Sequence, residues 1–570
     1  MNRMTSLYMA AVVSLAGAAC QPDAPPAAVS PPAALFDFAF ETPIASIEPG
    51  GTSTSPVAVN RSAAFGGSVA LHVAGLPAGV AAPDLTLDPA TARGLIAFTA
   101  DAAAVVGDTV LTITATGTGF SVSHPLALHV FVPTQSGPSI TQFTPEAAAV
   151  FVGDHTRLTA VFEGDSASVD GIGPVQSGTA IDTGPLPRTT TFTLRVRRGA
   201  EEVEAQTAVQ ARYRDRFRAL APSSVARSGH VAAALGDGRA MIMGGNTSES
   251  INVPDSDTSE VFDPATETLS PGPQLLFTAE AGLFTSVAEL SSGDFLLVGG
   301  GLNSGPGGQV ATQVFDSMGQ RFVRVGSVAT PARADARATP LADGGALLTG
   351  GAGLPPLGQV DRYDAGTGEW RAAGRLLFPR FEHTATLLKD GRVLIVGGIV
   401  CCEITPTAAT ETYTTTAEIY DPVQGTFVQT GSLFTARGSH AAALLTDGRV
   451  LVTGGAGNDP AAPPLGTEIY DPSTGEFSPA GDLLIPRQSH AAVALTDGRV
   501  LVVGGADPSS RAAIPATEIF DPAANLWSVG PALNAAWSGS TVTLLRGGKV
   551  LVFGGRTPDG GPVSTVLLFE

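Results

Sequence analysis

The sequence predicts an all-β protein in which a long repeat array follows two smaller β domains. Gly and Pro are abundant, charged residues make up only 15% of the chain, and no long stretch has helical periodicity. That composition is typical of all-β proteins with many turns. Seven Gly-Gly pairs also recur at intervals of about fifty residues. They are Gly244-Gly245, Gly299-Gly300, Gly350-Gly351, Gly397-Gly398, Gly454-Gly455, Gly504-Gly505 and Gly554-Gly555.

The N-terminus has the pattern of an export signal. Arg3 gives a positive start, and residues 7–15 form an apolar run that is too short to span a membrane. Cys20 follows three small residues, which resembles the cleavage site of a bacterial lipoprotein. Gly17 stands where that site usually has leucine.

We therefore expect a signal peptide at residues 1–19, lipidation of Cys20 and an extended Pro/Ala-rich tether at residues 20–34. The alternative is a secretory signal that is cut near Ala18 or Ala19. A lipid anchor would hold the protein at the outer membrane or cell surface. Without the anchor, the protein would be secreted or periplasmic.

Two segments after the tether alternate short apolar strands with turns, and each predicts a β-sandwich. They cover residues 35–134 and 138–213, with a Gly-Pro linker between them. Both resemble bacterial immunoglobulin-like domains, the first through its GLPAGV motif.

Residues 215–570 hold the repeats. Typical units begin RGSHAAALLTDGRVLVTGG or RQSHAAVALTDGRVLVVGG and continue to TEIYDPSTGEFS or TEIFDPAANLWS. Each unit has an apolar run, an Asp-Gly turn that we expect to be a type I′ hairpin, and a second apolar run that ends at the Gly pair. The Gly pair, the Tyr-Asp-Pro and the later aromatic resemble the kelch repeat, which implies a seven-bladed β-propeller.

The ring is expected to close with a strand from before the first repeat. Phe217 lies ten residues ahead of Arg227, as Phe427 lies ten ahead of Arg437. We therefore expect residues 216–220 to be the fourth strand of the last blade, which removes open sheet edges.

The sequence contains no motif for a metal or a cofactor, so neither is expected. Four histidines hold one repeated position, which indicates a structural role; they are His230, His383, His440 and His490. Kelch propellers include copper-radical oxidases similar to galactose oxidase, which need two Tyr, two His and a Cys cross-linked to a Tyr. Cys401, Cys402 and Tyr413 share one long loop, which keeps such an oxidase as the alternative function.

That loop, at residues 399–416, is the longest in the array. One interpretation is a solvated insertion. The other is a ligand-contacting lip, because binding residues favour loops on a rigid scaffold. Its candidate residues are Cys401, Cys402, Glu403 and Tyr413.

Five repeats carry an Arg before the first strand together with an acid on the third, and two repeats lack both. This agreement predicts one partly buried, bidentate ion pair inside each of the five blades. The predicted pairs are Arg227–Glu260, Arg333–Asp361, Arg380–Glu418, Arg437–Glu468 and Arg487–Glu518.

The formal net charge of −20 argues against nucleic acid and against anionic membrane surfaces as partners. We expect an exported, non-enzymatic binding or scaffold protein that reaches a membrane only through its lipid anchor. The propeller would present its loop face to a protein or glycan partner.

Overall fold

The computed structural model describes residues 35–132, 137–248, 256–276, 286–290, 293–299, 311–324, 334–352, 356–404, 409–459 and 461–570. Every regular element in these ranges is a β-strand, which confirms the all-β prediction. No helix in these ranges could span a membrane. The predicted signal, Cys20 and the tether lie outside the described residues. The chain divides into two compact units, Met1–Ser136 and Gly137–Glu570.

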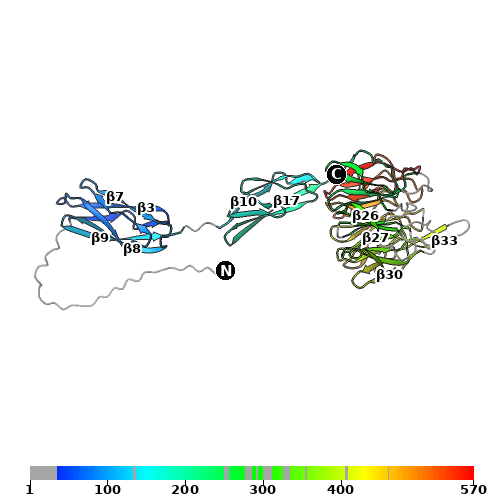
Figure 1. The fold of residues 1–570 in the computed structure, drawn as a ribbon, viewed down its shortest axis with the longest axis horizontal. Coiled ribbons are helices and arrows are strands. Elements are labelled where there is room, and N and C mark those ends of the chain that lie inside the picture. Colours follow the sequence, from blue (N-terminus) through cyan, green and yellow to red (C-terminus); the bar gives the residue numbers. More distant parts are fainter. Residues whose placement is uncertain are drawn as a thin grey trace. The chain divides into compact units, whose positions relative to one another are not determined.

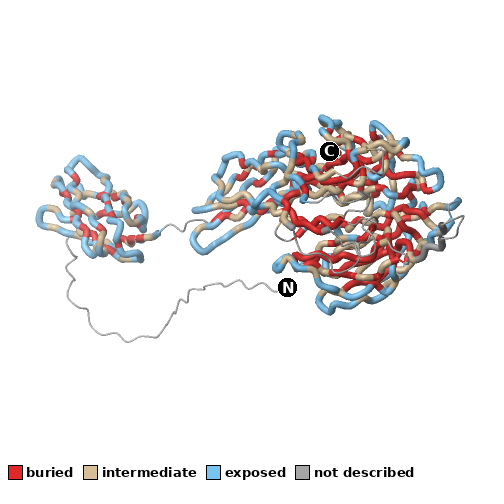
Figure 2. Tube along the Cα trace, turned by 45° about the vertical axis from the view of Figure 1, so that its right-hand side comes forward, coloured by how far each residue is buried: buried red, intermediate tan, exposed pale blue. Residues whose placement is uncertain are grey.

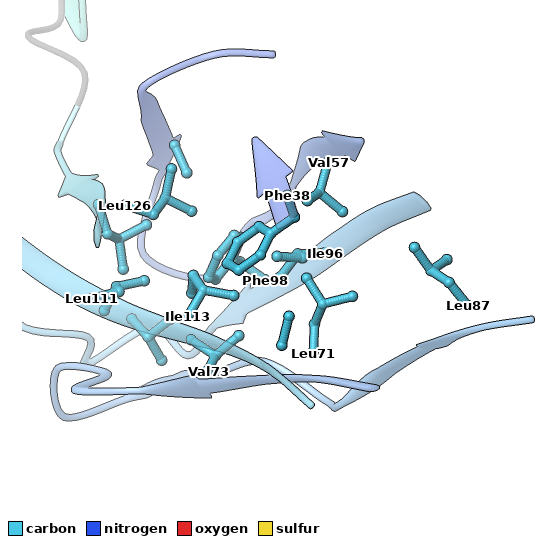
Figure 3. Packing of buried hydrophobic residues seen from close by; sticks show 14 of the residues in the cluster. Phe38, Val57, Leu71, Val73, Leu87, Ile96, Phe98, Leu111, Ile113 and Leu126 are labelled. Atoms are coloured by element: carbon cyan, nitrogen blue, oxygen red, sulfur yellow. The ribbon is translucent and has the colours of Figure 1, made fainter. Parts of the chain in front are cut away.

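The first unit consists of two sheets that face each other across one core. Its strands alternate buried and exposed residues, because one face of each sheet meets the core and the other meets water. Phe38, Ile96 and Leu111 lie among the residues of this core (Figure 3). One sheet is β1 (Phe36–Phe40), β3 (Thr52–Arg61), β7 (Arg93–Ala100) and β5 (Val80–Ala81); the other is β2 (Ile44–Ile47), β9 (Phe120–Val130), β8 (Gly107–Gly117), β4 (Val69–Ala74) and β6 (Leu85–Leu87).

The second unit begins with another pair of sheets that share a core built around Leu158, Leu194 and Val196. The first sheet is β10 (Ser139–Pro145), β12 (Arg157–Glu163) and β15 (Ala180–Asp182). The second is β11 (Ala149–Phe151), β17 (Glu201–Arg212), β16 (Thr190–Arg198), β13 (Ser166–Val169) and β14 (Gly173–Pro174).

Seven four-stranded antiparallel sheets follow within the described part of residues 217–570. The first sheet is β19 (Val231–Ala234), β20 (Ala240–Met243), β21 (Ser259–Asp263) and β22 (Thr268–Pro271). The second is β23 (Ser286–Glu289), β24 (Phe295–Gly299), β25 (Ala311–Asp316) and β26 (Arg321–Arg324). The third is β27 (Arg337–Pro340), β28 (Ala346–Thr349), β29 (Gln359–Asp364) and β30 (Glu369–Arg375).

The remaining four sheets continue the same order along the chain. They are β31 (Thr384–Leu387), β32 (Val393–Val396), β35 (Ala417–Asp421) and β36 (Thr426–Gln429); β37 (Ala441–Leu444), β38 (Val450–Thr453), β39 (Gly466–Asp471) and β40 (Glu476–Asp482); β41 (Ala491–Ala494), β42 (Val500–Val503), β43 (Glu518–Asp521) and β44 (Leu526–Val529); and β45 (Thr541–Leu544), β46 (Val550–Phe553), β47 (Val566–Phe569) and β18 (Phe217–Ala219).

These sheets form a β-propeller (Figure 1). The first strand of each sheet contacts the first strands of both neighbouring sheets, and β45 of the last sheet contacts β19 of the first. The first strands therefore surround the axis. The second strands, such as VLVV in β42, are buried along their length. They read as continuous apolar runs because neighbouring sheets cover both of their faces. Figure 2 shows buried residues, in red, throughout the propeller.

The ring closes as predicted. β18 pairs antiparallel with β47, with Phe217 opposite Phe569 and Ala219 opposite Leu567. Arg216 reinforces this seam, because its Nε donates to Glu570 Oε1 at 3.0 Å.

The Gly pairs allow successive sheets to approach closely. The Gly455 N–H donates to the Arg487 carbonyl of the next sheet at 2.8 Å. A Cβ on Gly454 would lie 2.4 Å from that same carbonyl oxygen and 2.7 Å from His490 Cε1. Both glycines also have positive φ, +58° and +104°. Only glycine meets both conditions without strain.

The Asp-Gly turns differ from the prediction. A type I′ turn needs two residues with positive φ, but only the glycine has one, as at Gly448 with φ +96°. The Gly448 N–H donates to the Leu445 carbonyl, and the Leu445 N–H donates to the Arg449 carbonyl. These are three-residue loops with a glycine bulge, in which Asp447 accepts the Arg449 N–H at 3.0 Å.

Candidate functional site

The residue just before the repeated histidine position has a left-handed backbone in six of the described sheets. Asp335, Glu382, Ser439 and Ser489 have φ between +49° and +54° there, and Gly229 and Gly539 hold the same position with φ +62° and +66°. A side chain in this conformation costs about 1–2 kcal/mol relative to glycine. Four sheets therefore keep a polar side chain where glycine would be less strained.

Glu382, Ser439 and Ser489 lie next to one another around the axis, and Asp335 holds the same position in the neighbouring sheet, whose first strand contacts β31. The Ser439 N–H donates to the Glu382 carbonyl at 3.1 Å, and the Ser489 N–H donates to the Ser439 carbonyl at 2.9 Å. Each residue also precedes the innermost strand of its sheet. We call the part of the ring formed by Asp335, Glu382, Ser439 and Ser489 the axis mouth.

Two carboxylates give the axis mouth its charge. Glu382 is half-buried and accepts a hydrogen bond from the Ser439 hydroxyl. Burial raises the pKa of Glu382, and Glu411 adds to this effect while Arg337 and Arg511 oppose it. Burial raises the pKa of Asp335 to about 7, with Glu382 adding to the shift and Arg337 opposing it.

The long insertion reaches the axis mouth through Tyr413. It forms the hairpin β33 (Ile399–Ile404) and β34 (Ala409–Tyr413), which projects from the propeller (Figure 1). The Tyr413 hydroxyl donates to Glu411 Oε2 at 2.7 Å. A Cβ on Gly438 would meet Cδ1 of the Tyr413 ring at 3.0 Å, so the ring lies over the neighbour of Ser439. Burial raises the pKa of Tyr413.

Asn458, from the next sheet, fixes this end of the hairpin. Its Oδ1 accepts the Tyr413 N–H at 2.8 Å, and its Nδ2 donates to the Tyr413 carbonyl at 3.2 Å. Cys401, Cys402 and Glu403 lie on β33, but their side chains are outside the described part of the chain. Of the four loop candidates, the structure therefore brings Tyr413 to the axis mouth.

Four of the five predicted Arg–acid pairs lie within contact distance inside one sheet. The distances are 3.5 Å from Arg227 Nε to Glu260 Oε2, 3.1 Å from Arg380 Nη2 to Glu418 Oε1, 2.8 Å from Arg437 Nη2 to Glu468 Oε1, and 2.6 Å from Arg487 Nη2 to Glu518 Oε1. Arg333 lies outside the described residues, and its predicted partner Asp361 is buried.

Two details of these pairs differ from the prediction. The arginines are completely buried rather than partly buried. The pairs are not bidentate, because Arg437 Nη1 donates to the first glycine of the Gly pair, at the Gly454 carbonyl, over 2.9 Å. The second oxygen of Glu468 is also occupied, since it accepts the Phe434 N–H at 2.8 Å. The acid thus holds the loop that leads into its own sheet.

The repeated histidines are structural parts of the ring. Each Nε2 is bonded to a threonine hydroxyl of the preceding sheet, at 2.8 Å for His230–Thr541, 2.8 Å for His383–Thr349, 3.0 Å for His440–Thr384 and 2.7 Å for His490–Thr453. Burial, followed by the nearby arginine, lowers the pKa of His230 and of His490 to about 3. These imidazoles are therefore neutral at physiological pH.

The opposite face of the propeller, which carries the Asp-Gly turns, is partly covered. The Tyr213 hydroxyl donates to the Gly548 carbonyl, and Arg499 Nη1 donates to Asp215 Oδ2 at 2.8 Å. Val152 of the preceding sandwich shares a core cluster with Leu495 of the propeller. A groove of about 480 Å³ also lies on this face, between the turns around Lys389, Asp447 and Asp471.

Sequence reasoning missed the axis mouth. A signal was present, because the residue before the histidine changes between repeats as Gly, Glu, Ser and Ser, while the histidine itself is kept. A polar position that varies inside an otherwise regular repeat is typical of a ligand-facing site on a rigid scaffold.

Comparison with known proteins yields a likeness in fold. No family model and no curated protein matches the sequence. The structure is similar to that of a fungal alcohol oxidase of the AA5 family in complex with copper, with a TM-score of 0.48 and 15% identity. The match covers 62% of this chain and 76% of the oxidase. It concerns the fold alone.

This similarity corrects one prediction. We expected the protein not to be an enzyme, and that expectation is contradicted by an alcohol oxidase among the structures that resemble it. We therefore no longer describe the chain as non-enzymatic.

The alternative function, a copper-radical oxidase, needs two Tyr and two His as copper ligands. Most of the described His and Tyr side chains of the propeller are instead part of its packing. The four propeller histidines are bonded to threonines, and Tyr363, Tyr420 and Tyr470 are buried within the sheets. Tyr413 alone among the propeller tyrosines lies at the axis mouth.

Proposed function

We propose that this protein is an exported binding protein whose propeller holds a partner at the axis mouth. In this proposal the propeller is seven-bladed and of the kelch type, and two immunoglobulin-like sandwiches precede it. The partner is a protein or a glycan. The supporting observation is that four sheets keep Asp, Glu or Ser in a strained conformation at the axis mouth, where two others have glycine.

Two further observations favour this face over the other. Tyr413 and Glu411 of the long insertion reach it, and their hydrogen bond gives it an additional polar edge. The opposite face is partly covered by the preceding sandwich. Its groove is lined mainly by the turns that close the hairpins, whose carboxylates already bond backbone N–H groups.

A paired-variant binding experiment tests this function. The variant Asp335→Asn/Glu382→Gln removes both charges of the axis mouth and keeps the size of each side chain. The matched control is Glu369→Gln/Glu476→Gln, which neutralises two exposed carboxylates on the outer strands β30 and β40. Each full chain is used for pull-down from envelope extracts and for glycan arrays. We expect binding that the first variant loses and the control retains; equal binding by both would refute the site.

The same preparations are assayed for copper and for the oxidation of alcohols and sugars. This measurement asks whether the axis mouth also converts what it binds. Turnover that depends on Asp335 or Glu382 would make the protein an enzyme at the proposed site.

Anchoring through Cys20 is part of the proposal and has its own test. Stable anchoring requires several acyl chains, and in a lipoprotein the Cys carries them. The variant Cys20→Ala should therefore move the protein from the membrane fraction to the soluble fraction. Unchanged fractionation would leave a secreted or periplasmic protein.

A further inference from the structure

An arc of exposed apolar side chains lies on the loops that lead into four of the sheets. Leu276, Leu377, Phe434 and Leu484 hold one repeated position and are 49%, 49%, 66% and 51% exposed. The residue before each of them is a buried leucine. We call these four side chains the apolar arc. The first and last sheets have Ser224 and Asn534 at the same position and the third has Thr330, so the apolar arc comes from the second sheet and from the fourth to sixth sheets.

Three of the four residues of the apolar arc lie on the same loops as residues of the axis mouth. Leu377 precedes Glu382 by five residues, and Phe434 and Leu484 precede Ser439 and Ser489 by the same interval. These three loops therefore each present an apolar side chain followed by a polar one at the axis, whereas the sequence has Ala281 five residues after Leu276 and Thr330 five residues before Asp335. Because the loops repeat around the ring, the four apolar groups surround part of a polar centre.

Buried side chains hold the apolar arc in place. The N–H groups of Leu377, Phe434 and Leu484 donate to Glu418, Glu468 and Glu518 at 2.8, 2.8 and 2.6 Å. In the second sheet, which has no such ion pair, the Leu276 N–H donates to the buried Gln313 at 2.9 Å. The exposed apolar groups therefore sit on a fixed backbone, which reduces the ordering cost of binding.

The charges around the axis mouth indicate what these groups meet. Asp335 faces Glu382 and Arg337, and Glu382 also faces Glu411 and Arg511. Part of the Arg337 guanidinium already bonds the backbone, because its Nε donates to the His383 carbonyl at 3.0 Å. Around Asp335 and Glu382 there are thus three carboxylates and two guanidinium groups, in a protein of net charge −20. Such a surface attracts a cationic partner and repels an anionic one.

Resting on the proposed function, we infer that the partner is a polypeptide segment in which a Lys or Arg side chain is flanked by apolar residues. The cation enters the axis mouth between Asp335 and Glu382, and its apolar neighbours pack on Phe434, Leu377 and Leu484. In protein interfaces, a central residue that dominates the binding energy, often Arg, is typically surrounded by near-neutral contacts that exclude water. Glycans present mainly hydroxyl groups and do not match the three leucines of the apolar arc.

The pH dependence of binding is a specific consequence. With its pKa near 7, Asp335 is partly protonated at neutral pH in the free protein. A bound cation favours the ionised carboxylate, so binding releases a proton. Affinity for a lysine or arginine peptide should therefore rise between pH 6 and pH 8, where its own side chain stays charged.

Selection from a random heptapeptide display library on the immobilised full chain tests the inference. We expect enriched peptides to carry a central Lys or Arg next to Leu, Phe, Ile or Met. Synthetic versions are then measured by fluorescence anisotropy against the full chain and its variants. Asp335→Asn/Glu382→Gln and Phe434→Ser should each weaken binding at least about tenfold. Val423→Ser, at a 93% exposed position in an Asp-Pro turn of the opposite face, should leave it unchanged.

The outcomes separate this inference from the proposed function. Enrichment of acidic peptides, or no enrichment, overturns the cationic segment. If a glycan array instead gives binding that Asp335→Asn/Glu382→Gln abolishes, the axis mouth is the site and the polypeptide is wrong. If Asp335→Asn/Glu382→Gln and Phe434→Ser both retain peptide binding, as the control Val423→Ser should, both the inference and the binding site fail.

Discussion

Removing Arg437 should destabilise the propeller strongly, because its partner Glu468 would remain buried with a charge. The Arg437 side chain has no exposed surface, the Glu468 side chain is 4% exposed, and 2.8 Å separates Nη2 from Oε1. Breaking a buried pair from one side typically costs about 3–5 kcal/mol. We expect Arg437→Leu to lower the free energy of unfolding by this amount.

Removing both charges should cost much less than the sum of the single changes. In Arg437→Leu/Glu468→Leu no buried charge remains, but the Phe434 and Thr435 N–H groups lose their acceptor. Each unsatisfied backbone group costs about 1–3 kcal/mol where water cannot reach it. A second double variant, Arg437→Leu/Glu468→Gln, copies Gln313, which bonds the corresponding loop without an ion pair. It should be the more stable double variant.

Unfolding by denaturant, followed by tryptophan fluorescence, measures these free energies. All three tryptophans of the chain lie in the propeller, so the signal reports that part alone. The quantity of interest is the coupling between positions 437 and 468 in the double-mutant cycle. Single-variant effects that add within about 0.5 kcal/mol would refute the pairing argument.

Three other predictions concern the histidines, the axis mouth and the seam. The folded pKa of His230 and His490 is about 3, below the unfolded value of 6.5, so stability is full above pH 6.5 and is lost as the pH falls toward 3. Between pH 7.5 and 5.5 each should remove about 1.4 kcal/mol, and His490→Gln should flatten the pH profile measured by chemical unfolding. The contribution of Asp335 to stability depends on pH in the opposite direction. Because its pKa is raised in the folded state, folding becomes less favourable as the pH rises from 3.8 to 7. Asp335→Asn should therefore stabilise the protein by up to about 4 kcal/mol at pH 8, since each pKa unit is worth about 1.36 kcal/mol, and by little near pH 4; a destabilised variant at pH 8 would contradict this. Deleting residues 1–221 removes β18 and should lower the melting temperature, whereas deleting residues 1–211 should leave the ring closed; equal melting temperatures would argue against the seam.

The repeat made the propeller predictable from the sequence. Apolar runs such as Val500–Val503 and the Gly pairs report conditions that every blade must satisfy, so they recur and can be recognised. The closing strand at Phe217 could be predicted for the same reason, because its spacing copies that of Phe427. Agreement between blades likewise pointed to the Arg437–Glu468 pair, although not to the Gly454 carbonyl that takes the second Nη.

The candidate site was harder to predict because it depends on backbone conformation. The identity of Glu382 or of Asp335 does not indicate a positive φ, and the two residues come together only when the third and fourth sheets pack side by side. Tyr413 was singled out by the unusual length of its loop, but its place over Gly438 follows from the bond to Asn458, a residue of another blade. Such contacts between repeats leave no periodic trace in the sequence.

The seam between β18 and β47 has a mechanical consequence. A pull on the part of the chain before residue 212 would load Tyr213 and Asp215 first, because both are bonded to turns of the propeller. Only after those bonds yield would tension reach Phe217 and the β18–β47 pairing. Glu570 and Arg216 are 354 residues apart along the chain, so a seam torn open would have to find its partner again across a very long loop. The bonds of Tyr213 and Asp215 therefore protect the β18–β47 pairing from tension, and this pairing is the contact that would re-form most slowly.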